Sequence, residues 1–190
     1  MNTPLAPRSQ GFAHRLFRVS DLYRMAEAGV IRPDERLELI QGELLEMSPK
    51  GARHEWLKIG LTRYFGRQCP DSVIFAQEPG WHIDEFTYLE PDFLFFPATL
   101  RIEAVKPDDA LLVIEIADSS YNFDLCAKAM LYAGLGVREY WVIDAAKRET
   151  HVHLMPKPDG YGAVRAYGEA IRLDPSLIRD LPVLLVDTPR

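Results

Sequence analysis

Two short apolar runs, each joined to a carboxylate, constrain the fold of this chain more than any other feature of the sequence. Asp92 opens the first run, and Glu115 closes the second. Short runs of bulky apolar residues bounded by proline or by charge are typical of buried strands. We therefore predict strands over residues 92–96 and 111–116.

The two predicted strands would bring their carboxylates to one edge of a sheet. If they pair as antiparallel neighbours, the start of the first lies beside the end of the second, so Asp92 and Glu115 would be close. The chain then enters a predicted helix that carries Asp124, Lys128 and Tyr132. These three share one face because residues four apart stack on a helix. The pattern predicts a site where two carboxylates meet a lysine.

An ordered set of short motifs around this stretch resembles a known family. The set runs from about residue 20 to about residue 155 and so covers most of the chain. Its members, in chain order, are residues 38–44, 47–49, His54, Pro91-Asp92, Glu115-Ile116, Asp124 with Lys128 and Tyr132, and residues 136–144. Together they are similar to the bacterial restriction endonuclease family of the Uma-two type, within the PD-(D/E)XK nuclease superfamily.

The resemblance implies both a fold and an activity. The fold would be α/β (α+β) and restriction-endonuclease-like, a mixed central sheet flanked by helices, with an N-terminal hairpin extension. The activity would be metal-dependent endonucleolytic hydrolysis of nucleic-acid phosphodiester bonds, with DNA as the expected substrate. Catalytic roles would fall to Asp92, Glu115, Lys128 and Glu43. Glu43 follows the turn of a hairpin predicted over residues 36–47, and a solvated hairpin carboxylate is its alternative interpretation.

Three further residues are predicted to contact substrate or to support the site. His54 lies in the first turn of a helix predicted over residues 52–67. A single histidine is more often a surface or capping residue, and the resemblance adds a role at the phosphate or the edge of the site. Asp124 could hold Lys128 in place as an i, i+4 pair. Tyr132 could support the site by packing or hydrogen bonding.

The chain departs from the family pattern at two places. The superfamily usually has Glu-X-Lys, whereas this chain has Glu115-Ile116-Ala117, so Lys128 must supply the lysine. The closer family often has Ser-Pro after the glutamate, whereas this chain has Asp118-Ser119, which adds a negative charge near the site.

The chemistry of the two carboxylates predicts the cofactor. Carboxylate oxygens are hard ligands that suit Mg²⁺ or Mn²⁺. A cation held in this way lowers the pKa of a bound water and neutralises a phosphate, and phosphodiester hydrolysis needs both effects. We expect one divalent ion bound by Asp92 and Glu115.

Two other functions compete with this prediction. The first is a catalytically weak or inactive module that binds nucleic acid or protein on the nuclease fold. It is favoured by Ala117 and by a net charge of 22 − 28 = −6, which argues against a protein that coats nucleic acid. The second is a carboxylate-pair hydrolase acting on sugars, but no aromatic-rich sugar platform is evident. Three converging charges favour the nuclease.

The remaining features bear on organisation and location. We predict a flexible arm over residues 1–15 and a single domain over residues 16–190. Cys69 and Cys126 lack metal-site spacing and are interpreted as reduced thiols. No apolar leader or membrane-length run is visible, so we expect a cytoplasmic protein that binds no membrane. The oligomeric state is open, with a homodimer among the alternatives.

Two histidines near the end of the chain form the last pattern considered. His151 and His153 lie two residues apart on a predicted strand over residues 150–155 and therefore share a face. This spacing can bind a metal, but no third ligand lies nearby in the sequence. We predict a solvent-facing pair.

Overall fold

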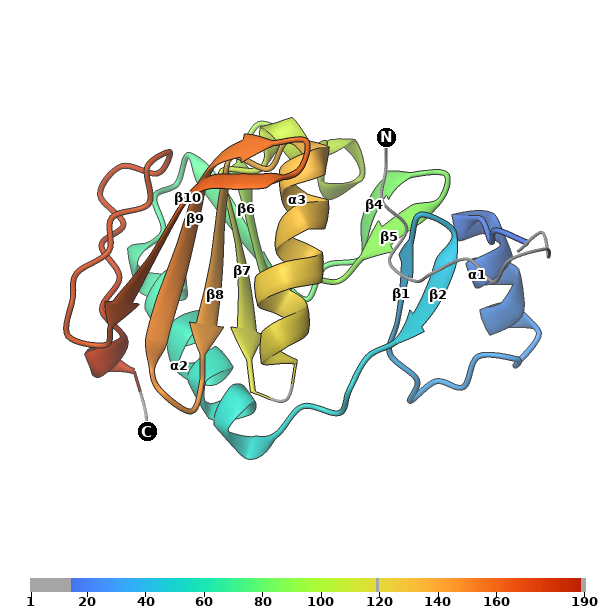
Figure 1. Ribbon diagram of the computed structural model, residues 1–190, viewed down its shortest axis with the longest axis horizontal. Coiled ribbons are helices and arrows are strands. Elements are labelled where there is room, and N and C mark those ends of the chain that lie inside the picture. The colour runs from blue at the N-terminus through green and yellow to red at the C-terminus, as the bar shows by residue number, and fades with distance from the viewer. Residues whose placement is uncertain (1–14, 119, 189–190) are drawn as a thin grey trace. The chain divides into compact units, whose positions relative to one another are not determined.

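A six-stranded mixed sheet forms the centre of the larger of two units in the computed structural model, which describes residues 15–118 and 120–188 (Figure 1). The small unit comprises Met1–Met47, as far as it is described, and His82–Leu89. The large unit comprises Ser48–Trp81 and Glu90–Arg190. A single domain over residues 16–190 stays a prediction, and the predicted arm lies outside the described residues except for Arg15.

The small unit combines one helix with a four-stranded antiparallel sheet in the order β2-β1-β5-β4. Its elements are α1 (Val19–Glu27), β1 (Leu37–Ile40), β2 (Glu43–Glu46), β4 (Trp81–Asp84) and β5 (Thr87–Leu89). The predicted hairpin is confirmed, because Ile40 pairs with Glu43 across a turn. Gln41 and Gly42 in that turn have φ of 52° and 83°, the left-handed conformation that two-residue hairpin turns require.

The large unit contains the strands and helices expected of the nuclease fold. Its principal elements are α2 (Ala52–Gln68), β3 (Val73–Gln77), β6 (Phe93–Pro97), β7 (Leu112–Ala117), the π-helical η3 (Phe123–Lys128), α3 (Ala129–Leu135), β8 (Glu139–Asp144), β9 (Glu149–Lys157) and β10 (Gly160–Gly168). Short 3₁₀ turns are η1 (Ile102–Ala104), η2 (Pro107–Asp109) and η4 (Leu185–Asp187). The predicted fold class is confirmed, as is the helix predicted over residues 52–67.

Strand order in the large sheet is β10-β9-β8-β7-β6-β3. β7 and β8 run parallel, and the other neighbouring strands are antiparallel. The predicted antiparallel pairing of the two carboxylate-bearing strands is confirmed, since Phe93 of β6 lies opposite Ile114 of β7. Asp92 just precedes β6 and Glu115 follows Ile114, so both carboxylates come to the same region of the sheet.

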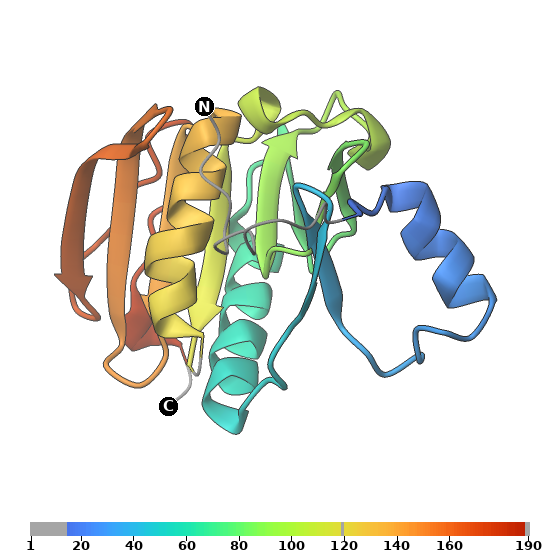
Figure 2. The same cartoon turned by 45° about the vertical axis from the view of Figure 1, so that its right-hand side comes forward.

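Helices cover both faces of the large sheet, with α2 on one side and α3 on the other (Figure 1, Figure 2). Leu57, Leu61 and Phe65 lie on one face of α2, and all three pack into the main core cluster. Ile114 and Ile116 of β7 belong to the same cluster. Because side chains alternate along a strand, the residue between them faces α3. Every residue of β7 is buried, as expected of a strand covered on both faces.

The segment after β7 departs from the predicted regular helix. Phe123–Lys128 forms a π-helical turn, which continues directly into α3. α3 ends at Gly136, whose φ of 89° is the left-handed conformation typical of a helix C-terminus. π-helical turns within helices are rare and are frequent at functional sites. The register of Lys128 and Tyr132 therefore depends on a turn that the apolar pattern does not reveal.

The prediction of a solvent-facing histidine pair is wrong for His153, which is 2% exposed. Its ring packs against Tyr140 and Tyr161, and its Nδ1 lies 3.2 Å from the carbonyl oxygen of Tyr140. Burial lowers the pKa of His153, although backbone hydrogen bonds oppose that shift. The error arises because α3 covers this face of β9.

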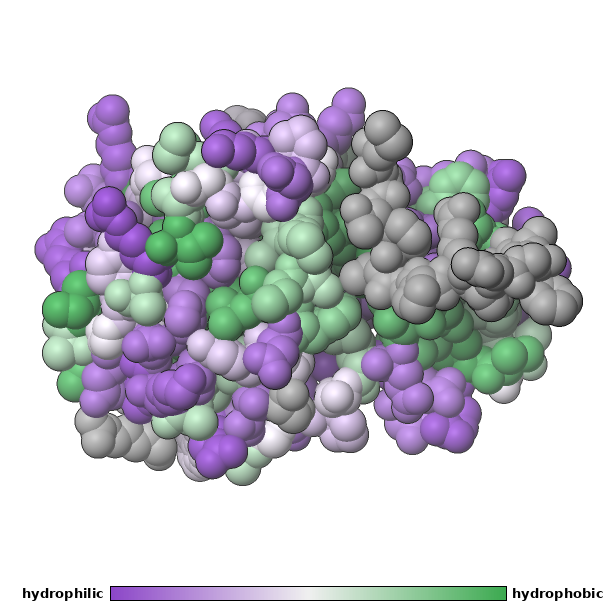
Figure 3. Space-filling view, in the orientation of Figure 1, coloured by the Kyte–Doolittle hydropathy of each residue, from purple (hydrophilic) through white to green (hydrophobic). Residues whose placement is uncertain are grey.

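The visible surface of the large unit is mixed in polarity. Figure 3 shows weakly hydrophobic side chains gathered over α3, among hydrophilic ones. In agreement, Met130 of α3 is 52% exposed. No helix among the described residues is both long enough and apolar enough to cross a membrane.

Candidate active site

Asp92 is a buried carboxylate of the large unit, 4% exposed, with hydrogen-bond partners on both oxygens. Its Oδ2 accepts a hydrogen bond from the backbone N–H of Ile116 at 2.8 Å and lies 3.0 Å from Nε2 of His54. Its Oδ1 accepts a hydrogen bond from Nζ of Lys50 at 2.9 Å. The carboxylate is therefore fixed on one side by β7 and on the other by residues at the start of α2.

The surroundings of Asp92 keep it ionised. Burial alone would raise the pKa of the Asp92 carboxyl. The hydrogen bond and charge of His54, the charge of Lys50 and the backbone N–H of Ile116 outweigh burial and lower that pKa below its ordinary value of 3.8. Asp92 is thus an anion at neutral pH, as a metal ligand must be.

Glu115 points to the α3 side of β7 and is also 4% exposed. Its Oε1 accepts hydrogen bonds from Nζ of Lys128 at 2.9 Å and from the hydroxyl of Tyr132 at 3.1 Å. Its Oε2 lies 3.4 Å from the backbone nitrogen of Asp92. The Glu115 carboxylate therefore lies against the backbone of Asp92, and each of the two carboxylates has a lysine amine on one oxygen.

The structure thus brings together five of the seven residues predicted for the site: Asp92, Glu115, Lys128, His54 and Tyr132. Asp124 is buried on the same π-helical turn as Lys128, and its Oδ2 accepts a hydrogen bond from Ser120 at 2.5 Å. Glu43 belongs to the small unit, at the start of β2. The catalytic or substrate-binding roles of all seven stay predictions.

Four charged residues that the sequence did not single out extend the network around Asp92: Lys50, Glu55, Lys58 and Glu78. Lys50 contacts Glu78 as well as Asp92. Lys58 donates hydrogen bonds to Glu78 at 3.1 Å and to Glu55 at 2.7 Å. Two signals could have pointed to them: Lys50 directly follows motif residues 47–49, and Glu78 directly precedes a Pro-Gly break.

The extra negative charge expected from Asp118 is neutralised locally. Its Oδ1 accepts hydrogen bonds from Arg53 at 2.9 and 3.2 Å. Its Oδ2 lies 2.7 Å from the position that a Cβ on Gly51 would occupy, so a side chain there would displace the carboxylate. Asp118 therefore ties the end of β7 to the start of α2. Ser119, the second residue of this departure, lies outside the described residues.

The site offers two carboxylates, Asp92 and Glu115, as ligands for Mg²⁺, and the described residues contain no larger set of metal ligands. Within residues 15–118 and 120–188 no group of three or more His, Cys, Asp or Glu side chains is placed to hold a metal ion. Mg²⁺, however, is commonly held by one or two carboxylates and keeps several waters. Asp92 and Glu115, two buried carboxylates, fit that requirement, and both now hold protein cations.

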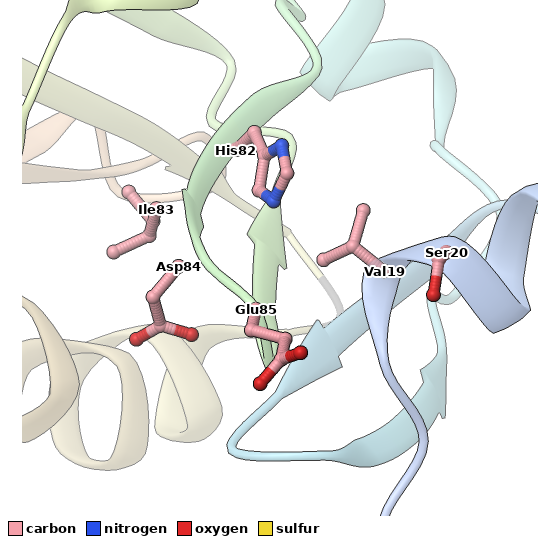
Figure 4. Close-up of a pocket in the computed structure, with 6 residues that line it drawn as sticks. All are labelled: Val19, Ser20, His82, Ile83, Asp84 and Glu85. Carbon is pink, nitrogen blue, oxygen red and sulfur yellow. The ribbon is translucent and has the colours of Figure 1, made fainter.

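A separate pocket lies in the small unit, with a volume of about 450 Å³ (Figure 4). Its lining residues are Val19, Ser20, His82, Ile83, Asp84 and Glu85. None of them belongs to the predicted site.

Comparisons with known proteins agree with the predicted fold and with the family resemblance. A crystal structure described as a putative nuclease belonging to DUF820, from Anabaena variabilis ATCC 29413, is similar to this chain with a TM-score of 0.68. The two are 13% identical in sequence over 90% of this chain and 96% of the other, so the likeness shows the fold alone. No curated protein matches the sequence. The Uma2 family model, described as "Putative restriction endonuclease", matches residues 19–183. Since that match spans most of the 190 residues, the chain belongs to the Uma2 family.

Proposed function

We propose that this protein is an endonuclease that hydrolyses DNA phosphodiester bonds with Mg²⁺ or Mn²⁺ bound by Asp92 and Glu115. The observation that carries the proposal is a pair of buried carboxylic acids, Asp92 and Glu115, each paired with a lysine amine, with the Glu115 carboxylate against the backbone of Asp92, in a chain of the Uma2 family.

The energetics of this arrangement support a functional interpretation. Burying a charged group costs several kcal/mol, and even a paired charge is seldom more stabilising than an apolar side chain of similar size. Glu115 and Lys128 are 4% and 1% exposed. An arrangement that contributes little to stability but gathers charges in one place is typical of a site selected for chemistry.

Each residue around the two carboxylates would have its own role in catalysis. A bound divalent ion supplies an activated water and neutralises charge on the phosphate. Lys128 and Tyr132 would fix the orientation of Glu115, because both donate to its Oε1. His54 would fix Asp92 through Oδ2. Lys128 would also stabilise the negative charge that builds on the phosphate during hydrolysis.

The charge of the chain bears on the conditions for activity. With a net charge of −6, the protein should bind DNA weakly and be sensitive to salt. Assays therefore belong at low ionic strength. The competing function, a binding module without activity, would also bind nucleic acid but would leave it intact.

Cleavage of a panel of supercoiled, linear, branched and single-stranded substrates, with Mg²⁺, Mn²⁺ or EDTA, tests the proposal. Glu115→Gln should abolish cleavage. Asp144→Asn is the matched control, because Asp144 ends the neighbouring strand β8 and caps only its own turn. Cleavage that survives Glu115→Gln would contradict the proposal. Metal binding without cleavage of any substrate would favour the binding module.

A further inference from the structure

Lys50 stands between two carboxylates at the Asp92 side of the site. Its amine lies 2.9 Å from Oδ1 of Asp92 and also contacts Oε1 of Glu78. Its side chain is 14% exposed, whereas that of Lys128 is 1% exposed. Of the two lysines on the paired carboxylates, Lys50 is therefore the one that solvent reaches more easily.

Glu78 is held in an uncommon conformation that presents its carboxylate to Lys50. Its φ of 48° lies in the left-handed region, which non-glycine residues rarely adopt. Its backbone N–H donates to the carbonyl oxygen of Asp92 at 3.1 Å. Lys58 donates to the same carboxylate oxygen that contacts Lys50. Backbone and side chain are thus both fixed next to Asp92.

The two oxygens of Asp92 are not equivalent. Oδ2 already accepts the backbone N–H of Ile116 and contacts His54, whereas Oδ1 contacts the amine of Lys50. Oδ1 is therefore the oxygen that a metal ion would take. An ammonium group and a divalent ion on the same oxygen repel each other strongly at that distance, so the Lys50 amine competes with an ion for Oδ1.

We propose that the Lys50 amine is the counter-ion of Asp92 in the metal-free protein and that a divalent ion must displace it. The displaced amine would then pair with Glu78 alone. The inference rests on the proposed function, since it takes the Asp92–Glu115 pair as the ion-binding site. Lys50 is then a positioning residue. In the metal-free protein it neutralises the charge of Asp92 and fixes the orientation of its carboxylate. It also lowers the affinity of the site for the ion, because it competes with the ion for Oδ1.

Calorimetry with Mn²⁺, in the absence of nucleic acid, tests this competition directly. Lys50→Met removes the amine while keeping an unbranched side chain as far as the Cε position, and it should tighten Mn²⁺ binding at least about tenfold, which corresponds to about 1.4 kcal/mol. Lys58→Met is the matched control, because the side chain of Lys58 is 7% exposed and contacts Glu78 but has no contact with Asp92 among those described. It should change the affinity much less.

The outcomes separate this inference from the proposed function. A disturbed fold would weaken binding, so a gain in affinity cannot come from structural damage. If wild type binds Mn²⁺ and Lys50→Met binds it equally or less well, the inference is overturned and the proposed function stands. Equal gains in Lys50→Met and Lys58→Met would also overturn it, because they would reflect only the lost positive charge. Wild type that binds no Mn²⁺ would overturn both.

The role of Glu78 has its own test, a double-mutant cycle. If Glu78 acts by receiving Lys50, Glu78→Gln should weaken Mn²⁺ binding in wild type and have little effect in the Lys50→Met background. An equal loss in both backgrounds would show that Glu78 acts on the ion directly, which would overturn this part of the proposal.

Discussion

The two carboxylates of the site lie in contrasting surroundings. Glu115 is paired on the α3 side with Lys128, which is 1% exposed. Asp92 is paired on the α2 side with Lys50, which is 14% exposed and shares its amine with Glu78. The first pairing is buried from solvent, whereas the second is partly open to it. The proposed ion binding therefore takes the Glu115 side as a fixed frame and the Asp92 side as the position where the ion enters.

The largest effect on stability should come from removing Lys128, the buried partner of Glu115. Lys128→Met leaves Glu115 buried without its amine, and loss of one partner of a buried ion pair costs about 3–5 kcal/mol. We expect a loss of that size in the free energy of unfolding, measured with urea at pH 7, together with loss of cleavage. Lys147→Met, which breaks a pair whose lysine is 62% exposed, should cost at most about 1 kcal/mol. Equal losses in the two variants would contradict the contrast.

The dependence of stability on pH should reveal the contribution of the Asp92 carboxylate. The folded state lowers the pKa of Asp92 below 3.8, so the unfolded state binds more protons as the pH falls through that range. The stability that Asp92 contributes is therefore present above about pH 4 and is lost at lower pH. Asp92→Asn removes this dependence.

The measurement is the free energy of unfolding of wild type and Asp92→Asn between about pH 3 and 6. We expect wild type to be more stable at pH 6 and the difference to shrink towards pH 3. A difference that stays constant or grows at low pH would show that the carboxylate is not stabilised as an anion in the folded state.

A smaller effect should follow from Tyr132→Phe, which removes one hydrogen bond to Glu115 and keeps the buried ring. The expected loss is about 1 kcal/mol in the free energy of unfolding. Cleavage should fall less than in Lys128→Met, because the amine still pairs with the same oxygen. A larger loss of cleavage than in Lys128→Met would assign the main role on this side to the hydroxyl.

The smallest effect is expected at the rim of the site, where Arg53 pairs with Asp118. Arg53 is 67% exposed, so solvent screens the pair and Arg53→Met should change the free energy of unfolding by less than about 1 kcal/mol. If the variant loses cleavage at unchanged stability, the pair acts in substrate binding. A large loss of stability would mean that Asp118 needs this partner to remain in place.

The contrast between the two sides also explains what could be predicted from the sequence. Glu115 follows from the end of an apolar run, and the shared face of Lys128 and Tyr132 follows from the four-residue spacing of a helix, both of which are local patterns, although the π-helical turn before Ala129 was not predicted. Asp92 follows from the antiparallel pairing of two adjacent apolar runs. The strands, the fold class and the Glu115 side were therefore accessible before the structure.

The Asp92 side was accessible only in part. Lys50 and Glu78 are 28 residues apart (78 − 50) and meet because β3 returns the chain beside α2, which no local pattern reveals. No pattern of apolar residues predicts the left-handed conformation of Glu78 either. The π-helical turn and the burial of His153 were missed for the same reason, since both depend on how α3 packs on the sheet.

The central claim is that Asp92 and Glu115 together bind a divalent ion, and a crystal soaked in Mn²⁺ tests it most directly. Anomalous scattering should place one manganese ion between Oδ1 of Asp92 and the Glu115 carboxylate, with the Lys50 amine moved from Asp92 to Glu78. Manganese bound elsewhere, or no manganese at this pair at concentrations that support binding in solution, would contradict the account.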